Sequence, residues 1–333
     1  MSSSSALDAS TFTELAEPHR HELRVHCYRM LGSFDDAEDV VQESLLRAWR
    51  QRASFEGRSP FRTWLYRIAT NACLDSLRHR TRRVLPQDVA PPNVPPEQVP
   101  DIGEVLWLQP YPDRLLDQAE SSPEAAVIAR ETIELTFIAS IQLLPPRQRA
   151  ALLVRDVLDW SAAETAALLD TSVASVNSLV QRARATLQRH RPARRTEWSA
   201  PDVTPHEQDL LERFMRACEV GDASAIVDML ADDARCTMPP FAWWFAGKDA
   251  VADSFRVGVG PGRPGDFRTL ATRANRQPAC ATYMRSFGDD AYRAFAIDVL
   301  RIEDGRIVEV TAFHETHLFQ AFGLPSTLND QNR

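Results

Sequence analysis

The sequence lacks long apolar runs: no stretch of its 333 residues approaches the roughly 18 apolar residues that span a bilayer. Residues 1–10 hold neither a basic residue nor an apolar stretch, so we expect no secretory signal there. The five cysteines are odd in number and scattered, without a C-x-x-C pair, which favours reduced thiols over disulfides or a zinc site. We therefore expect a cytoplasmic protein that makes no membrane contact.

Lysine is also scarce, because Lys248 is the only one and arginine supplies 37 of the 38 basic residues. The net charge of −8 hides an uneven distribution along the chain. Residues 18–83 and 123–195 carry net charges of +5 and +3, whereas residues 84–122 and 196–333 carry −6 and −7. Two basic modules, separated by an acidic linker and followed by an acidic domain, indicate that the basic parts contact nucleic acid.

The first basic module, residues 18–83, is almost free of glycine and proline and predicts several helices. In residues 34–50 the apolar side chains form one stripe, and acidic side chains fill the first turn, where the helix dipole favours negative charge. A turn at 54–60 precedes a second helix over 61–77, whose apolar residues also recur at a spacing of three to four.

The second of these helices has two interpretations, because it carries aromatic side chains and ends in arginines. Its basic end either complements the negative pole of the helix dipole or belongs to a surface that binds nucleic acid. In the latter case the aromatic rings stack on bases and the arginines hold phosphates. Taken alone, the segment favours the first interpretation.

Residues 84–122 predict an acidic linker. Its first part, residues 84–100, is rich in proline and poor in core material, as extended tethers are. The following residues, 105–111, include Trp107 and Tyr111 and are too apolar for a solvated tether. We expect this second part to dock on another surface.

Residues 123–195 predict a second helical module that contains a helix-turn-helix. A long helix over 124–144 is stopped by two prolines. Ser161 then opens an S-x-x-E capping box, and Ser172 caps a helix that runs to about residue 189. That last helix bears short polar side chains suited to base edges. An ordinary helical hairpin is the alternative.

From Thr204 the chain changes character and predicts a separate α+β domain over 204–325. Two helices, broken at Gly221, lead into a strand, and later segments alternate apolar and polar residues as strands do. The EDG sequence at 303–305 is a hairpin turn signal between two of these strands.

Taken together, residues 18–83 and 123–190 resemble the extracytoplasmic-function (ECF) sigma factors of bacterial RNA polymerase. YRMLGSFDDAEDVVQESLLRAWR is similar to the family's core-binding region, and FRTWLYRIATNACLDSLRHRTRR to its −10 recognition and melting region. LPPRQRAALLVRDVLDWSAAETAALLDTSVASVNSLVQRARATL is similar to its −35-reading domain. The resemblance implies a multidomain fold, in which two all-α modules precede the α+β domain.

The resemblance also implies roles for individual residues. Contacts with core polymerase are implied for Asp36, Asp39, Val40, Gln42 and Glu43. Contacts with the −10 element are implied for Arg62, Trp64, Tyr66, Asn71, Arg78, Arg80, Arg82 and Arg83. Contacts with the −35 element are implied for Ser172, Ser175, Asn177, Ser178, Gln181, Arg182 and Arg184. The implied partners are promoter DNA and core RNA polymerase, at its β′ coiled-coil and β flap.

Residues 204–325 resemble SnoaL-like domains of the ketosteroid-isomerase type, a cone of curved sheet closed by helices. Enzymes on this fold use an Asp or His within an apolar cone. The candidates by residue type are Asp298, Tyr283, Tyr292, His314 and His317. The alternatives are a small-molecule pocket, lined by Phe241, Trp243, Trp244 and Phe245, and a packed regulatory domain. The two histidines of HETH do not converge on a metal, and we predict neither metal nor cofactor.

The function predicted from all these features is that of a sigma factor, which performs no covalent chemistry and is regulated by its own C-terminal domain. The acidic domain would shield the basic modules electrostatically. The alternatives are an isomerase- or cyclase-like enzyme with a DNA-binding N-terminus and a helix-turn-helix repressor. A repressor needs no acidic helix ahead of an arginine-rich aromatic helix, so the sequence favours the sigma factor.

Overall fold

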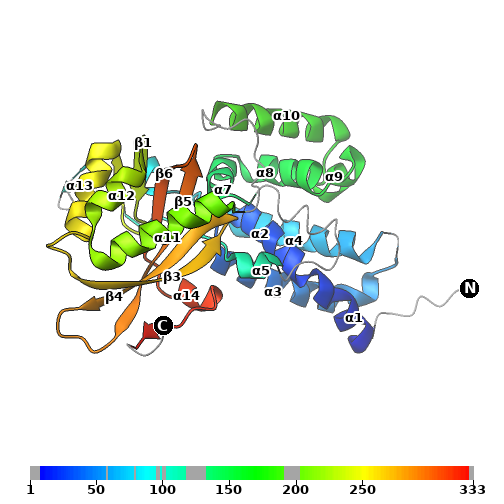
Figure 1. Ribbon diagram of the computed structural model, residues 1–333. Helices are drawn as coiled ribbons and strands as arrows, with labels where there is room; N and C mark the ends of the chain where they lie inside the picture. Colours follow the sequence, from blue (N-terminus) through cyan, green and yellow to red (C-terminus); the bar gives the residue numbers. More distant parts are fainter. Residues whose placement is uncertain are drawn as a thin grey trace, which may run out of the picture. The chain divides into compact units, whose positions relative to one another are not determined.

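The computed structural model describes residues 8–57, 59–78, 80–94, 98–99, 103–117, 133–190 and 203–329. The chain forms two compact units, one containing Met1–Arg83 with Leu115–Ser199 and the other Val84–Arg114 with Ala200–Arg333 (Figure 1). Most of the predicted linker thus packs with the C-terminal domain. None of the described helices combines the length and the apolar character that crossing a membrane requires.

The first unit begins with a bundle of α-helices, and the helices predicted over 34–50 and 61–77 are confirmed. Gly32, with φ of 69°, ends the second helix, and the Ser33 hydroxyl accepts the Asp36 N–H to begin the third. The helices are α1 (Ala9–Ala16), α2 (Arg20–Leu31), α3 (Phe34–Gln51) and α4 (Phe61–Leu77), with 3₁₀ turns η1 (Glu17–His19) and η2 (Arg52–Ser54).

The second helical module follows in the same unit and contains the predicted helix-turn-helix. Ser161 and Glu164 form the expected capping box, and Ser172 caps the last helix. The long helix predicted over 124–144 is wrong, because Glu134 is extended (ψ 143°) and helix begins only after it; residues 124–132 lie outside the described residues. The elements are α7 (Leu135–Gln142), α8 (Pro146–Leu152), the π turn η5 (Leu153–Val157), α9 (Ala162–Leu168) and α10 (Val173–Arg189). The short helix α5 (Asp113–Asp117) begins in the second unit and ends in the first.

A buried arginine joins the two helical modules. Arg149 on α8 is 2% exposed and donates hydrogen bonds to the backbone carbonyls of Met30, Gln142 and Leu144 and to the Gln142 side chain. The Gln142 amide in turn donates to the Arg29 carbonyl across 3.3 Å. Burial lowers the pKa of Arg149 to about 9. The guanidinium thus ties α8 to the carboxyl end of α2 through main-chain oxygens.

The second unit contains a mixed sheet covered by helices, which confirms the predicted α+β domain. Strands follow the order β2-β1-β6-β5-β4-β3, with β7 paired to β5. The helices are α11 (Pro205–Val220), α12 (Ala223–Met229), α13 (Lys248–Gly258) and α14 (Leu318–Ala321). The strands are β1 (Leu230–Thr237), β2 (Trp244–Ala246), β3 (Gly265–Ala274), β4 (Gln277–Ser286), β5 (Tyr292–Glu303), β6 (Arg306–Phe313) and β7 (Thr327–Leu328).

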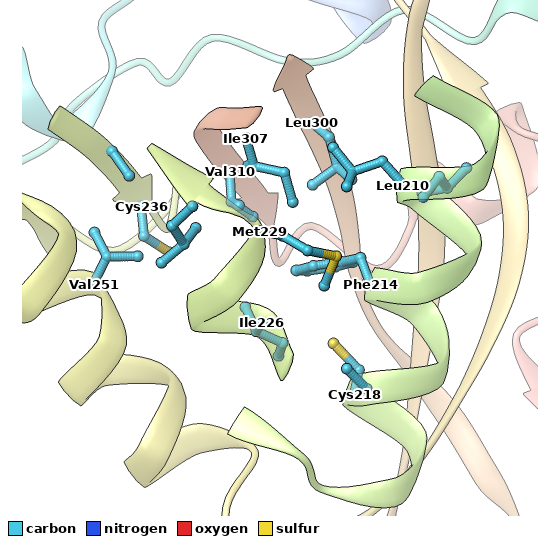
Figure 2. Close-up of a cluster of buried hydrophobic side chains, with 14 of the residues drawn as sticks. Leu210, Phe214, Cys218, Ile226, Met229, Cys236, Val251, Leu300, Ile307 and Val310 are labelled. Carbon is cyan, nitrogen blue, oxygen red and sulfur yellow. The ribbon is translucent and has the colours of Figure 1, made fainter. Parts of the chain in front are cut away.

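The core of this unit lies between α11, α12 and the sheet. Figure 2 shows Phe214 and Cys218 of α11, Met229 of α12 and Val310 of β6 among its buried side chains. The turn predicted at 303–305 joins β5 to β6, and its residues Asp304 and Gly305 both have positive φ, as a tight hairpin turn requires.

The predicted linker is docked on this domain as a strap, which we define as residues 84–94 and 103–114. Within the strap the N–H groups of Val84 and Leu108 donate to the carbonyls of Leu106 and Val84. Leu108 and Tyr111 are fully buried. The expectation that the apolar part of the linker docks is therefore confirmed.

Asparagine side chains make the main polar contacts of the strap. The Asn93 side chain accepts from the Ala246 N–H at 2.9 Å and donates to the Ala246 carbonyl at 3.2 Å, like an added strand residue. The Asn275 carboxamide oxygen accepts from the Tyr111 N–H at 2.7 Å. Arg114 donates to the Ala321 carbonyl at 2.7 Å. The strap is thus fastened at the β2 edge, at the β3–β4 turn and at α14.

These contacts predict that the variant carrying Asn93→Gly and Asn275→Gly loosens the strap. Both asparagines have positive φ, 59° and 54°, so glycine removes the side-chain bonds without backbone strain. Each lost bond is worth about 0.5–1.5 kcal/mol, so we expect amide exchange at residues 84–94 and 103–114 to accelerate at least about fivefold. Hydrogen exchange read by mass spectrometry measures this.

Asp304→Gly is the matched control, because Asp304 also has positive φ (50°) but lies in the β5–β6 turn. It is expected to leave exchange in the strap unchanged. Equal exchange in the double variant and the native chain would contradict the role assigned to the asparagines.

Candidate functional site

One face of α3 carries the residues predicted to contact polymerase. Asp39 and Gln42 are exposed, and Val40 and Glu43 are half-buried. Glu43 also forms an i,i+4 ion pair with Arg47 at 2.7 Å. The exposed polar groups on this face are therefore Asp39 and Gln42.

Asp36 is half-buried and contacts two arginines. Arg80 and Arg83 lie 2.8 and 2.5 Å from its carboxylate. Burial alone would raise the pKa of Asp36, but the hydrogen bonds and charges of Arg83 and Arg80 outweigh it and lower the pKa. Two of the arginines predicted to hold phosphates thus neutralise one of the carboxylates predicted to bind polymerase.

Sequence reasoning missed Leu46, which lies on the same face of α3 seven residues after Asp39. The residue is 42% exposed, which makes it one of the few large apolar residues in the described part of the chain that face solvent. Exposed apolar groups beside charged ones are typical of protein interfaces. Its spacing of seven residues from Asp39, about two helical turns, could have placed it on this face. The apolar residues next to it in the sequence instead suggested that it belongs to the buried stripe.

Trp64 lies in an aromatic cluster at the start of α4. Its ring is half-buried, and its centroid lies 5.2 Å from Phe55 and 5.5 Å from Phe61. Phe55 follows η2, so the predicted turn at 54–60 packs on the helix through its aromatic ring. Asn71, two turns further along α4, is exposed.

The prediction that Tyr66 stacks on a base disagrees with the position of its side chain. Tyr66 is 2% exposed, its hydroxyl donates to Glu22 at 3.2 Å, and its ring lies 6.4 Å from that of Trp160. Burial, followed by the charge of Glu22, raises its pKa well above the usual value. The aromatic residue faces the core because it shares the apolar stripe of α4 with Leu65 and Ala69.

Arg62 is likewise engaged within the protein. Its guanidinium forms bonds of 2.7–3.0 Å with the Glu22 carboxylate, which also accepts from His19 at 2.6 Å. Burial alone would raise the pKa of Glu22, but the bonds from His19 and Arg62 outweigh it and lower the pKa. Among the predicted −10 residues, Arg78, Arg80 and Arg82 have exposed side chains.

Helix α10 presents a polar outer face. Val176, Val180, Ala183 and Leu187 are buried on its inner face. Arg184 is exposed but paired with Asp156 at 2.7 Å, and Ser175 is half-buried. The other predicted −35 residues, Ser172, Asn177, Ser178, Gln181 and Arg182, are exposed. The structure therefore brings five of the seven −35 candidates to the open surface of one helix.

Sequence reasoning also missed Val173, the first residue of α10, which is 44% exposed. An apolar side chain at the start of a recognition helix is suited to the methyl group of thymine. Its position directly after the N-cap Ser172 was the signal that could have found it.

The C-terminal domain contains an apolar cavity of about 530 Å³ between the sheet and helices α11 and α13. Of the four aromatic residues predicted to line it, Phe241 and Trp243 do, whereas Trp244 and Phe245 do not. Trp244 instead donates its indole N–H to the Ala90 carbonyl of the strap at 2.8 Å. Successive side chains of β2 point to opposite faces. Trp244 therefore meets the strap, whereas Phe245 packs against the core cluster instead of the cavity.

Among the five candidates for acid–base chemistry, Asp298 and His314 line the cavity, and Tyr283, Tyr292 and His317 do not. The Thr282 hydroxyl donates to the Asp298 carboxylate at 2.5 Å. Burial raises the pKa of Asp298 to about 6, and that hydrogen bond opposes the rise. Burial lowers the pKa of His314. No group of three or more His, Cys, Asp or Glu suited to a metal occurs among the described residues.

Comparison with known families places three models along the chain. The model of Sigma-70 region 2 matches residues 15–83, that of Sigma-70, region 4 matches 135–187, and that of the SnoaL-like domain matches 211–310. The first two ranges contain the α3 face, α4 and α10. The third contains most of the sheet and the cavity.

Individual relatives agree with these models. The ECF RNA polymerase sigma factor SigG of Mycobacterium tuberculosis (strain CDC 1551 / Oshkosh) is 45% identical over 318 residues, which cover 95% of this chain and 85% of the relative. SigW of Bacillus subtilis (strain 168) is 30% identical over 183 residues, 55% of this chain and 89% of the relative. The crystal structure of the Mycobacterium tuberculosis sigma factor SigJ aligns with a TM-score of 0.59 and 23% identity, covering 94% of this chain and 99% of that one.

The raised pKa of Asp298 predicts a pH dependence of stability. A carboxyl whose folded pKa is about 6 and whose unfolded pKa is 3.8 binds its proton more tightly in the folded state. Its contribution to the free energy of unfolding is therefore lost as the pH rises through 6, by about 1.4 kcal/mol between pH 5 and 8. Asp298→Asn should remove this component, which urea titrations across that pH range measure.

Asp290→Asn is the control, because Asp290 lies exposed before β5. It should retain the loss seen in the native chain. The same pH profile in Asp298→Asn and in the native chain would show that Asp298 ionises as it does in the unfolded protein.

Proposed function

The chain belongs to the ECF family of RNA polymerase sigma factors, and from that premise we propose which surfaces bind core polymerase and promoter DNA and how the C-terminal domain controls them. The observation that carries the proposal is that the polar faces of α3 and α10 are exposed while their apolar faces are buried. The protein acts in the cytoplasm, where RNA polymerase works, and the proposal assigns no reaction to it.

The polymerase contact is assigned to the α3 face formed by Asp39, Gln42 and Leu46. The carboxylate suits a basic residue of the β′ coiled-coil, and Leu46 supplies the apolar contact that an interface core needs. Asp36 contributes less directly, because Arg80 and Arg83 already neutralise it. The second helical module is proposed to bind the β flap.

The −10 contact is assigned to Asn71 and Trp64, with Arg78 and Arg82 on phosphates. Arg80 is paired with Asp36, so it can bind a phosphate only by leaving that carboxylate. A base captured from the separated strand loses a few kcal/mol of stacking, which an aromatic platform and a hydrogen-bonding amide recover. Trp64, with Phe55 and Phe61 beside it, forms a half-buried aromatic platform at the start of α4.

The −35 contact is assigned to the outer face of α10. Asn177, Ser178 and Gln181 read base edges in the major groove, and Arg182 holds a phosphate. Arg184 is paired with Asp156, so it can bind a DNA phosphate only by leaving the Asp156 carboxylate.

Promoter binding also requires the two helical modules to separate, because −10 and −35 elements lie apart on DNA. In the closed arrangement Arg149 and Gln142 bond to main-chain oxygens of α2, and Trp160 packs on Tyr66. We assign this arrangement to the unbound protein.

The C-terminal domain is proposed to control that separation by holding the strap. The strap lies in the sequence between the two helical modules, so its length limits how far they move apart. While the strap is docked, its residues add little to the distance that the linker can span between the modules. Fully extended, the 31 residues 84–114 would span about 100 Å. A chain ending near residue 195 would lack the surface on which the strap docks, so the full chain carrying Asn93→Gly and Asn275→Gly tests this control more cleanly than a truncation.

The polymerase assignment predicts that Asp39→Arg weakens binding of the full chain to core RNA polymerase about tenfold, because a like charge replaces an attractive one. Fluorescence anisotropy of the labelled protein measures the affinity. Asp209→Arg is the control, since Asp209 is 63% exposed on α11 of the other unit. Failure of the native chain to bind core polymerase would overturn the function itself.

The −35 assignment predicts different effects for two neighbours on α10. With promoters selected from genomic DNA by the reconstituted holoenzyme, Arg182→Ala should lower the salt dependence of binding by about one unit of log slope. Gln181→Ala should relax the −35 sequence that is selected. Arg213→Ala, on α11, should change neither, and uniform effects from all three variants would refute the assignment.

A further inference from the structure

The residues that line the cavity of the C-terminal domain include few ionisable side chains. Its wall is mostly apolar, with contributions from Phe214, Met238, Phe255 and Phe267. Among the lining residues, the ionisable side chains are those of Asp298 and His314 and the thiols of Cys218 and Cys236. The thiols of Cys218 and Cys236 have pKa values raised by burial, so they stay protonated and unreactive.

Asp298 lies on β5, in the middle of the sheet. Its carboxylate has a donor in the Thr282 hydroxyl, on the neighbouring strand β4, and the Cys280 thiol lies 3.9 Å away. Two carboxylate oxygens offer about four acceptor sites, so one strong donor leaves room for a second donor that enters from the cavity.

The size of the cavity suits a small molecule. A volume of about 530 Å³ lies within the range of about 300–1,000 Å³ typical of small-molecule pockets. A mostly apolar wall with one carboxylate favours an uncharged, mostly apolar molecule that donates a hydrogen bond to it. An anion would meet the Asp298 carboxylate, and a strongly polar molecule would lose its hydration without replacement.

The wall of the cavity is continuous with the fastening of the strap at β2. Phe241 and Trp243 line the cavity, and their rings stack with centroids 5.2 Å apart. The next residue, Trp244, bonds to the strap through its indole N–H and accepts the Asn93 N–H with its carbonyl at 3.0 Å. Movement of Trp243 is therefore transmitted to the strap through the adjacent residue, Trp244.

A second segment repeats this arrangement. His314 and Thr316 line the cavity, and Glu315 between them accepts from the Gln109 amide of the strap at 3.1 Å. The His314 N–H donates to the Pro239 carbonyl at 2.9 Å, which joins this segment to the one before Phe241. The two cavity-lining segments are thus bonded to each other, and each is bonded to the strap.

We propose that the cavity is an effector site for an uncharged, mostly apolar small molecule whose hydroxyl donates to Asp298, and that its occupancy stabilises the docked strap. The occupied cavity holds residues 238–246 and 314–316 in place, so opening of the strap must work against ligand binding. This goes beyond the proposed polymerase and promoter contacts, and its test contains neither partner.

The test uses 2-naphthol, an uncharged fluorescent aromatic alcohol, titrated into the full chain at pH 7.5. We expect saturable binding with a Kd on the order of 10–100 µM. 2-Methoxynaphthalene, which lacks the donor, and 2-naphthoate, which is an anion, should each bind at least about tenfold more weakly.

Two variants locate the binding. Asp298→Asn should weaken 2-naphthol at least about tenfold, because the charge-assisted hydrogen bond is lost. Ala294→Leu should abolish binding by filling the cavity, which Ala294 lines. Asp290→Asn is the matched control and should bind like the native chain. Circular dichroism confirms that each variant is folded.

The rate of hydrogen exchange in residues 84–94 measures the coupling between the cavity and the strap. With 2-naphthol at ten times its Kd, full coupling slows exchange about elevenfold, and Asp298→Asn should remove the effect at the same concentration. The proposal is overturned by absence of 2-naphthol binding, by equal binding to Asp298→Asn, or by unchanged exchange in the strap of the saturated protein. None of these results bears on whether the chain binds polymerase.

Discussion

The docking of the strap on the C-terminal domain depends in part on the hydrogen bonds that Asn93 and Asn275 make between the two. Asn93 and Asn275 both adopt left-handed backbone conformations, in which the carboxamide substitutes for a neighbouring peptide group. A proline-rich segment with few N–H donors cannot join a sheet as a regular strand. Side-chain amides supply the missing pairing, so a linker with little secondary structure of its own, such as the 3₁₀ turn at Pro86–Asp88, still has a defined path on the domain.

Much of the helical part could be predicted from the sequence, because the stripes of α3, α4 and α10 follow the period of 3.6 residues. The direction of Tyr66 could not, since an aromatic residue on an apolar stripe is suited both to a core and to a base-stacking surface. The start of α7 at Leu135 was missed for a different reason. The sequence before it has no proline or glycine that predicts a break, whereas the backbone of Glu134 is extended, so α7 begins after it.

Some residues of the candidate sites could likewise be predicted from the sequence, and others could not. Asn177 and Gln181 could be placed on the outer face of α10 by their spacing from buried Val176 and Val180. The partners of Asp36 could not, because Arg80 and Arg83 are more than forty residues away in the sequence and no local pattern pairs them. Asp298 was identified by residue type, but its environment depends on Thr282, which the register of β4 with β5 brings near it.

The strap and the C-terminal domain belong to the same polypeptide as the helical modules, so each molecule carries one copy of each. Capture of the strap is therefore an intramolecular equilibrium, governed by an effective local concentration rather than by the amount of protein in the cell. A separate inhibitor would need its synthesis matched to that of its target, and a shortfall would release activity. Under the proposed control, the ratio of restrained to released molecules would be independent of expression level.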